Sequence, residues 1–173
     1  MLFKVLGGIL ILASSSSIGF IIANYYNERP KLLRQLQNAL SMLETEINFS
    51  NSPLPEALRN VALRCDKDVA FLFSKTREYI NSMDGFTASE AWEKALKSYS
   101  KAKSLNETDF DILYAFGKYL GTSDREDQIN KLKLAISQLK SQEVKAEEDK
   151  DKSERVWKYL GVMTGLLIVL LLL

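Results

Sequence analysis

Hydrophobic and polar positions divide the chain into three parts. Residues 1–26 and 159–173 are almost free of charge, whereas residues 27–158 carry nearly all of it. In that middle part, apolar side chains recur at every third or fourth position, which is the period of an α-helix, and they nowhere alternate as in a strand. The pattern predicts an all-α protein, in which a helical bundle of about six helices is flanked by an N-terminal and a C-terminal transmembrane helix.

The N-terminal apolar segment has no charge from Val5 to Tyr26. A helix of these 22 residues rises ~1.5 Å per residue and is roughly 33 Å long, enough to cross a hydrocarbon core of about 30 Å. The alternative is a cleaved signal peptide with Lys4 before its apolar core. The apolar run resumes at Ile18, which favours a retained helix. Small residues at every fourth position would let a second helix approach closely: Ser15, Gly19 and Ala23.

The C-terminal apolar segment, Tyr159 to Leu173, is only 15 residues long, which gives a helix of about 22 Å. Local thinning of the bilayer, or packing against the N-terminal helix, would have to compensate for that length. Gly161 and Gly165 form a GxxxG step, a second face suited to close helix packing. The alternative is a buried helix of a soluble protein, which is poor because so small a domain could not cover it on all sides.

Basic residues lie mostly on one side of the two apolar segments. Only Lys4 lies beyond the first segment, whereas several basic residues follow it or precede the second: Arg29, Lys31, Arg34, Lys150, Lys152, Arg155 and Lys158. Positively charged loops tend to stay in the cytoplasm. The distribution therefore predicts a cell-membrane protein whose middle part is cytoplasmic and whose two termini lie outside.

Proline, glycine and capping residues mark the helix ends in the middle part. We expect a first helix from Pro30, a second from the Ser52–Pro55 break to about Arg64, and a third over about 66–83. The capping box Thr87–Glu90 should begin a fourth helix, and a fifth should follow over about 107–120. A second capping box, Ser123–Glu126, should begin a long sixth helix.

Mostly apolar residues at helical spacing predict an inner face in four of these helices: Leu33, Leu36, Leu40, Leu43 and Ile47 in the first; Val69, Leu72, Phe73, Thr76 and Ile80 in the third; Ala88, Ala91, Trp92, Ala95, Leu96 and Tyr99 in the fourth; and Ile129, Leu132, Ile136 and Leu139 in the sixth. The fifth helix is apolar on more than one side, so we expect it to be the most buried. Gly121 should end it in a left-handed conformation.

The composition argues against a catalytic or metal site. The chain has no histidine, the commonest general base and metal ligand, and a single cysteine, Cys65. The net charge is +1 and the basic residues are scattered among acidic ones, which argues against nucleic-acid binding. We therefore expect a protein that needs no cofactor or metal, is not an enzyme, and acts by binding other proteins. A membrane-bound enzyme with an unrecognised site is the less supported alternative.

Short segments along essentially the whole chain match one known family in order and spacing. They are Glu28–Pro30, Leu33–Leu36, Leu43–Ile47, Ser52–Leu58, Ala91-Trp92, Phe116–Gly121, Ser123-Asp124 with Gln128, and Leu160–Val162 with Gly165. No single segment is decisive, but together they resemble the stage III sporulation protein AB family of endospore-forming bacteria.

The resemblance implies a role in endospore formation, within a multi-protein complex of the mother-cell membrane. The family is similar to the inner-membrane platform proteins of type II secretion systems. This likeness implies a secretion-like channel in which the protein's cytoplasmic domain docks the complex's ATPase, while its membrane helices contact lipid and other channel subunits. A passive membrane tether for a soluble partner is the alternative, and a homo-oligomer is a further option. The candidate partner contacts are the polar residues of the matched segments: Arg29, Arg34, Glu44, Glu46, Glu56, Asp124 and Gln128.

Overall fold

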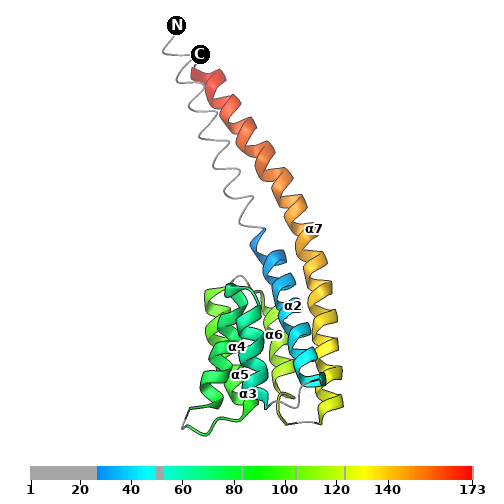
Figure 1. Ribbon diagram of the computed structural model, residues 1–173. Coiled ribbons are helices and arrows are strands. Elements are labelled where there is room, and N and C mark those ends of the chain that lie inside the picture. The colour runs from blue at the N-terminus through cyan, green and yellow to red at the C-terminus, as the bar shows by residue number, and fades with distance from the viewer. Residues whose placement is uncertain (1–26, 50–52, 83, 104, 123, 173) are drawn as a thin grey trace. The chain divides into compact units, whose positions relative to one another are not determined.

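The computed structural model describes residues 27–172 except 50–52, 83, 104 and 123 (Figure 1). These residues form helices and no strand, as the all-α prediction requires. The helices are α2 (Glu28–Phe49), α3 (Leu54–Arg64), α4 (Lys67–Ile80), α5 (Ala88–Ala102), α6 (Glu107–Gly117) and α7 (Arg125–Leu172). Their number agrees with the expected six, and no breaker interrupts the last one.

The chain divides into two compact units. The bundle unit is Lys31–Glu143, and the terminal unit is Met1–Pro30 together with Val144–Leu173. The bundle unit holds most of α2, all of α3 to α6, and residues 125–143 of α7. The fold described below is that of the bundle unit.

The two predicted transmembrane helices receive no support from the structure. Within the described part of the chain, no helix is long and apolar enough to cross a membrane. The predicted helix 1–26, with its packing residues Ser15, Gly19 and Ala23, lies outside the described residues. The predicted segment 159–173 belongs to α7 as far as Leu172, so Gly161 and Gly165 are helical residues.

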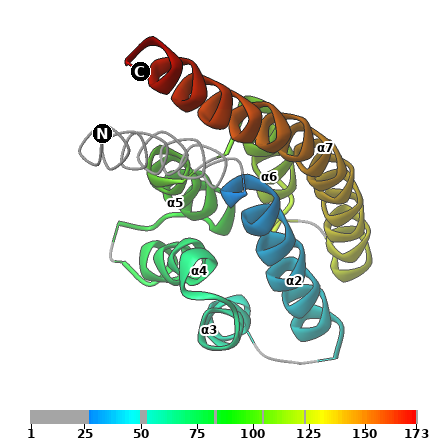
Figure 2. The same ribbon diagram turned by 90° about the horizontal axis from the view of Figure 1, so that it is seen from above.

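Four helices pack in chain order. In the bundle unit, α3 packs on α4, α4 on α5, and α5 on α6. Figures 1 and 2 show α3, α4 and α5 together on one side of this unit, with α2 and the first part of α7 on the other. The core therefore lies between helices that are mostly neighbours in sequence, as expected for chain segments joined by short loops.

The predicted inner faces are the buried ones. In α2, α4 and α5 the fully buried side chains include Leu33, Leu36, Leu40, Leu43, Val69, Leu72, Phe73, Thr76, Ala91, Trp92, Ala95, Leu96 and Tyr99. The predicted members at the helix ends, Ile47, Ile80 and Ala88, are only half-buried. Helical periodicity thus identified the core of these three helices correctly.

The expectation that the fifth helix is the most buried is confirmed: five of the 11 residues of α6 are buried, a larger share than in any other helix of the described residues. In α6, Ile112, Leu113 and Phe116 are buried, but Phe110 and Tyr114 are only half-buried. Those two rings stack on each other with centroids 5.9 Å apart. Their mutual contact covers apolar surface that the sequence pattern had assigned to the core.

Trp92 joins three helices in the centre of the bundle unit. Its indole is fully buried in α5 and makes edge contacts with Phe73 of α4 and Phe116 of α6, at centroid distances of 5.7 and 5.3 Å. The indole Nε1 donates a hydrogen bond of 2.8 Å to the carbonyl oxygen of Leu113. A buried indole N–H needs such a partner, because leaving it unpaired would cost desolvation energy.

One of the two predicted capping boxes is confirmed. At the start of α5, Thr87 Oγ1 accepts from the Glu90 amide at 3.3 Å, and Glu90 Oε2 accepts from the Thr87 amide at 2.9 Å. At the start of α7 the prediction was wrong by one residue. Asp124 is the cap there, and its Oδ1 accepts from the Asp127 amide at 2.8 Å.

The start of α6 has a capping box that the sequence reading missed, formed by Asn106 and Asp109. The end of α6 also differs from expectation. The helix ends at Gly117, and residues 118–122 continue as turns. Gly121 has φ +74, the left-handed conformation that we expected of it.

Candidate docking surface

Polar contacts pair α2 with the first part of α7. Arg34 of α2 bonds to Glu143 of α7 at 2.8 Å, and ten residues further along α2, Glu44 lies 3.8 Å from Lys133, ten residues earlier on α7. The two helices therefore run in opposite directions, as Figure 1 shows. At the far end, the Arg125 guanidinium donates to the carbonyl oxygens of Ile47 and Asn48.

The Arg125 contact has a clear physical role. The last carbonyl groups of a helix lack partners within the helix, and they carry partial negative charge. A guanidinium placed over them satisfies two of them at once, so Arg125 ties the end of α2 to the start of α7.

Glu143 is the centre of the strongest polar cluster in the bundle unit. Its carboxylate is 1% exposed. Arg34 Nε donates to Oε1 at 2.8 Å, Gln37 Nε2 donates to Oε2 at 2.8 Å, and Lys140 Nζ donates to Oε2 at 2.9 Å. Gln37 also donates to the Leu33 carbonyl at 3.1 Å, which fixes its side chain along α2. We call these four residues, Arg34, Gln37, Lys140 and Glu143, the Glu143 cluster.

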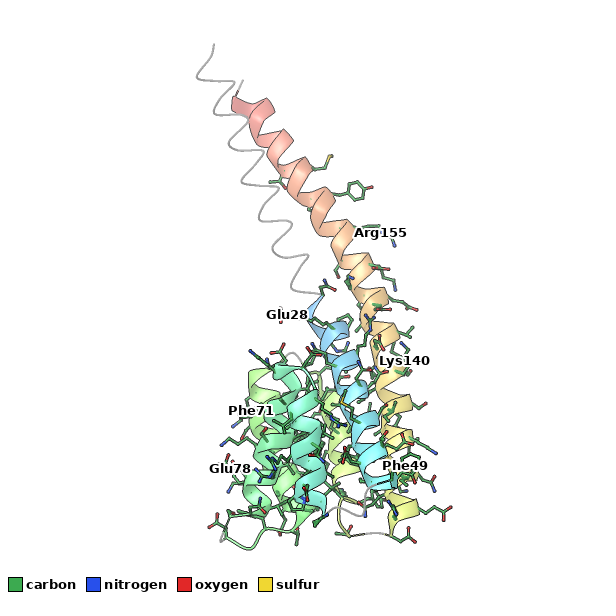
Figure 3. All side chains as sticks on the ribbon, in the orientation of Figure 1. Glu28, Phe49, Phe71, Glu78, Lys140 and Arg155 are labelled. Carbon is green, nitrogen blue, oxygen red and sulfur yellow. The ribbon has the colours of Figure 1, made fainter. Side chains whose placement is uncertain are left out.

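The Glu143 cluster keeps its carboxylate charged. Burial by itself would raise the pKa of Glu143, but the hydrogen bonds from Lys140, Gln37 and Arg34 outweigh burial and lower the pKa to about 2. A buried carboxylate is tolerated only when it is paired and hydrogen-bonded in this way. Lys140, labelled in Figure 3, and Arg34 are themselves largely exposed, so the cluster links a buried acid to the surface.

Glu46 of α2 likewise makes polar contacts with a neighbouring helix, α3. Its Oε2 accepts from Asn60 Nδ2 at 3.0 Å, and its Oε1 lies 3.6 Å from Arg64. The Glu46 side chain is mostly buried, whereas Arg64 is exposed. The Asn60 bond therefore contributes more to the fold than the screened contact with Arg64.

The predicted partner contacts thus fall into two groups. Arg34, Glu44, Glu46 and Gln128 contact other elements of the bundle unit, and Asp124 caps the start of its own helix, α7. Gln128 Oε1 accepts from the Gly121 amide at 3.3 Å, which holds the turn between α6 and α7. These contacts within the protein are enough to explain why polar residues occupy these positions, with no need for a partner protein.

The two remaining candidates differ from that group. Glu56 is exposed in the first turn of α3, where an acidic side chain suits the helix dipole. Arg29 is half-buried and belongs to the terminal unit. Among the candidates of the bundle unit, Glu56 is exposed and joins no two elements in the described contacts, so it fits a contact surface best.

The sequence reading missed the acid at the centre of the cluster. The predicted inner face of α7 was Ile129, Leu132, Ile136 and Leu139, and continuing its spacing by four residues reaches Glu143. The apolar face fades from Lys140 onward in the sequence, and charged residues are rarely buried, so Glu143 was not expected on the inner face. A charged residue four positions after Leu139, in line with the inner face, is the sequence signal that could have revealed the cluster.

Acidic and sulfur-containing side chains form no obvious reactive centre in the described residues. No group of three or more histidine, cysteine, aspartate or glutamate residues there could hold a metal ion. Cys65 is half-buried, and burial raises the pKa of its thiol. A raised thiol pKa lowers the fraction of reactive thiolate at neutral pH.

Comparison with known proteins identifies the family. The family model described as stage III sporulation protein AB matches residues 4–173. This chain belongs to the stage III sporulation protein AB family. The stage III sporulation protein AB of Bacillus subtilis (strain 168) is 36% identical over 170 residues, which cover 98% of this chain and 99% of the relative.

A solved structure of the family has the same fold. A stage III sporulation protein AB (SpoIIIAB) structure matches with a TM-score of 0.66 and 35% identity, over 72% of this chain and 97% of the solved chain. The family resemblance inferred from the segment order is therefore confirmed, and the chain is a sporulation protein of this family.

Proposed function

We propose that the protein is the membrane platform component of a secretion-like multi-protein channel complex needed for endospore formation, and that its helical bundle docks the complex's cytoplasmic ATPase. The observation that carries the proposal is the extent of the family likeness. It spans residues 4–173 and so includes both apolar ends as well as the bundle. An all-α domain carried between two apolar ends is what a membrane platform requires.

In this proposal the apolar ends anchor the protein in the cell membrane. Residues 1–26 are long enough to span, and the shorter segment 159–173 would pack against them through Gly161 and Gly165. The basic residues that flank the two segments would hold the bundle in the cytoplasm on the mother-cell side. The protein then acts by binding the ATPase, other membrane subunits and lipid, and carries out no chemistry itself.

The polar contacts that hold the helices of the bundle unit together support a docking role. The Glu143 cluster and the Arg125 contact fix α2 against α7, and Trp92 fixes α4, α5 and α6. A platform that meets an ATPase has to keep its surface in one conformation while the partner changes shape, and buried polar networks of this kind favour a single packing.

The test is a direct binding measurement with the full-length chain in lipid nanodiscs and the purified ATPase of the same complex. Saturable binding to nanodiscs that carry the chain, and none to empty nanodiscs, is the expected result. A helical, cooperatively melting chain that binds no ATPase would overturn the docking proposal. The passive tether would then be the better description.

A further inference from the structure

A shallow apolar groove runs between α6 and the first part of α7. Its volume is about 180 Å³, and it lies wholly within the bundle unit. The lining is mostly aliphatic or aromatic and includes one charged side chain, in the set Ile112, Ala115, Phe116, Tyr119, Lys131, Leu134, Ala135 and Gln138. We call these residues the α6/α7 groove.

Apolar side chains of the α6/α7 groove are exposed to solvent. Leu134 is 53% exposed, Tyr119 is 38% exposed, and Ala115 is also exposed. Single exposed leucines are common, but apolar residues gathered around a hollow mark interaction sites. The small side chain of Ala115 lets another chain approach the backbone of α6 closely.

A cation stands at the rim of the groove. Lys131 Nζ lies over the Tyr119 ring, 4.5 Å from its centroid. In the described part of the chain, no carboxylate lies within ion-pair distance of Lys131, whereas Lys133 two residues later pairs with Glu44. A cation beside an apolar hollow favours an occupant that brings a carboxylate, because charge complementarity selects the partner and its orientation.

The length of the groove matches about two turns of a helix, whose apolar side chains the hollow would receive. The lining residues span 112–119, from α6 into the turn that follows it, and 131–138 on α7, a length of about two helical turns on the α7 side. An amphipathic helix docks in such a groove through apolar side chains three or four positions apart. The occupant should therefore present two such apolar residues with an acidic residue one turn away, to meet Lys131.

We infer that the α6/α7 groove receives an amphipathic helix of the complex's ATPase, with an acidic residue of that helix paired to Lys131. This rests on the proposed function, which supplies the ATPase as the partner that faces the bundle. The groove adds the surface and the chemistry of the contact. It also places the contact away from the Glu143 cluster, whose side chains already hold the bundle together.

Two substitutions test the inference in the nanodisc binding measurement. Leu134→Glu puts a charge into the apolar hollow, and Lys131→Glu reverses the rim charge. Both side chains contribute little to the core, so circular dichroism spectra and melting temperatures should stay close to those of the unsubstituted chain. Each change should weaken ATPase binding at least about tenfold, as expected for a residue at the centre of an interface.

Matched controls separate the groove from general surface charge. Leu63→Glu makes the same change at a leucine of α3 that is 73% exposed, and Lys67→Glu makes the same reversal at an exposed lysine of α4. The helices that carry them, α3 and α4, lie on the opposite side of the unit from the first part of α7 (Figure 2). Binding by these variants should stay within about twofold of the unsubstituted chain, the change usual for residues outside an interface.

Photo-crosslinking gives a second, direct readout. A benzoylphenylalanine placed at position 134 should crosslink to an ATPase helix that carries an acidic residue among apolar ones, whereas one at position 63 should not. If the unsubstituted chain binds but the groove variants bind equally well, the groove inference is wrong and the proposed function stands. If the unsubstituted chain does not bind the ATPase, both are wrong. If Leu134→Glu instead dissociates an oligomer of this chain in light scattering, with ATPase binding intact, the groove is an interface between copies and the inference is likewise overturned.

Discussion

Gly117 lies directly against the indole ring of Trp92. A methyl group at position 117 would come within 2.1 Å of Trp92 Cδ1 and 2.8 Å of its Nε1. The same indole is held in place by its hydrogen bond to Leu113, one turn earlier in α6. The absence of a side chain at position 117 therefore allows α5 and α6 to pack at their observed separation.

Gly117→Ala should lower the free energy of unfolding by about 1–3 kcal/mol or more, because an added methyl group must displace a fully buried ring. Urea denaturation followed by circular dichroism measures this. Gly85→Asn is the control, since Gly85 has φ +71 with open space around it and asparagine tolerates that conformation. A Gly117→Ala variant as stable as the control variant would show that the Trp92 contact is not a constraint on the fold.

The stability of the bundle should depend on the ionisation of Glu143. Its pKa falls from the ordinary value of 4.5 to about 2 in the folded state. A group whose pKa is lowered on folding stabilises the fold above its unfolded-state pKa, and this contribution is lost as the pH falls through the folded-state value. Between about pH 5 and pH 2, the unsubstituted chain should therefore lose on the order of 2–3 kcal/mol through this group.

Glu143→Gln provides the comparison for that titration. The variant cannot ionise at position 143, so its stability should fall less steeply with pH over the same range. At pH 7 it should be less stable by about 1.5–3 kcal/mol, because the donors Arg34, Gln37 and Lys140 lose a charged acceptor. Parallel pH profiles for the two proteins would be inconsistent with a lowered pKa at Glu143.

Lys133→Ala should have a small effect. Its contact with Glu44 is 3.8 Å long and Lys133 is 63% exposed, so water and salt screen the attraction. We expect a loss of less than about 1 kcal/mol, in contrast to substitutions at Glu143. Denaturation of both variants under one condition tests whether α2 and α7 are held mainly by the buried cluster. A loss at Lys133 equal to that at Glu143 would refute this ranking.

Asp124→Ala should reduce stability but leave docking intact. Removing a helix cap of this kind costs about 1 kcal/mol, and Asp124→Asn should restore most of it, because asparagine caps equally well. ATPase binding, measured at a temperature where each variant is folded, should be unchanged in both. Weaker binding by a fully folded Asp124→Ala chain would show that Asp124 contacts the ATPase after all.

Glu56→Lys tests the one sequence-derived candidate that is exposed in the first turn of a helix. If Glu56 contacts the ATPase, charge reversal should weaken binding several-fold, by about 1 kcal/mol, the size expected of an interfacial charge pair at the rim. Glu107→Lys is a matched control, since Glu107 is an exposed glutamate in the first turn of α6. Equal binding by the two variants would show that Glu56 does not contact the ATPase.

Local rules accounted for much of the fold. The leucine spacing of α2 and the apolar face of α5 identified buried residues, and Thr87 with Glu90 marked the start of a helix correctly. These features depend on interactions within a few residues along the chain, which the sequence displays directly. The boundary errors, at Asp124 and Gly117, are displacements of one to three residues, where competing caps differ little in free energy.

The candidate site was harder to predict from the same information. Arg34, Glu44 and Glu46 were chosen because they are polar residues of segments shared with the family. The structure brings Glu143 to Arg34 across more than a hundred residues, and Asn60 to Glu46 across a loop. A polar residue that serves an internal contact looks the same in sequence as one that serves a partner.

The amino-acid sequence by itself determined the all-α class, the helical faces, the apolar character of both ends and the family, because each depends on residue type and spacing along the chain. Only the tertiary structure decided that Glu143 is a buried, charged residue, that Trp92 requires a glycine at position 117, and that α6 and α7 leave an apolar groove beside Lys131. These three features arise between segments distant in sequence, where burial and pairing depend on which helices meet.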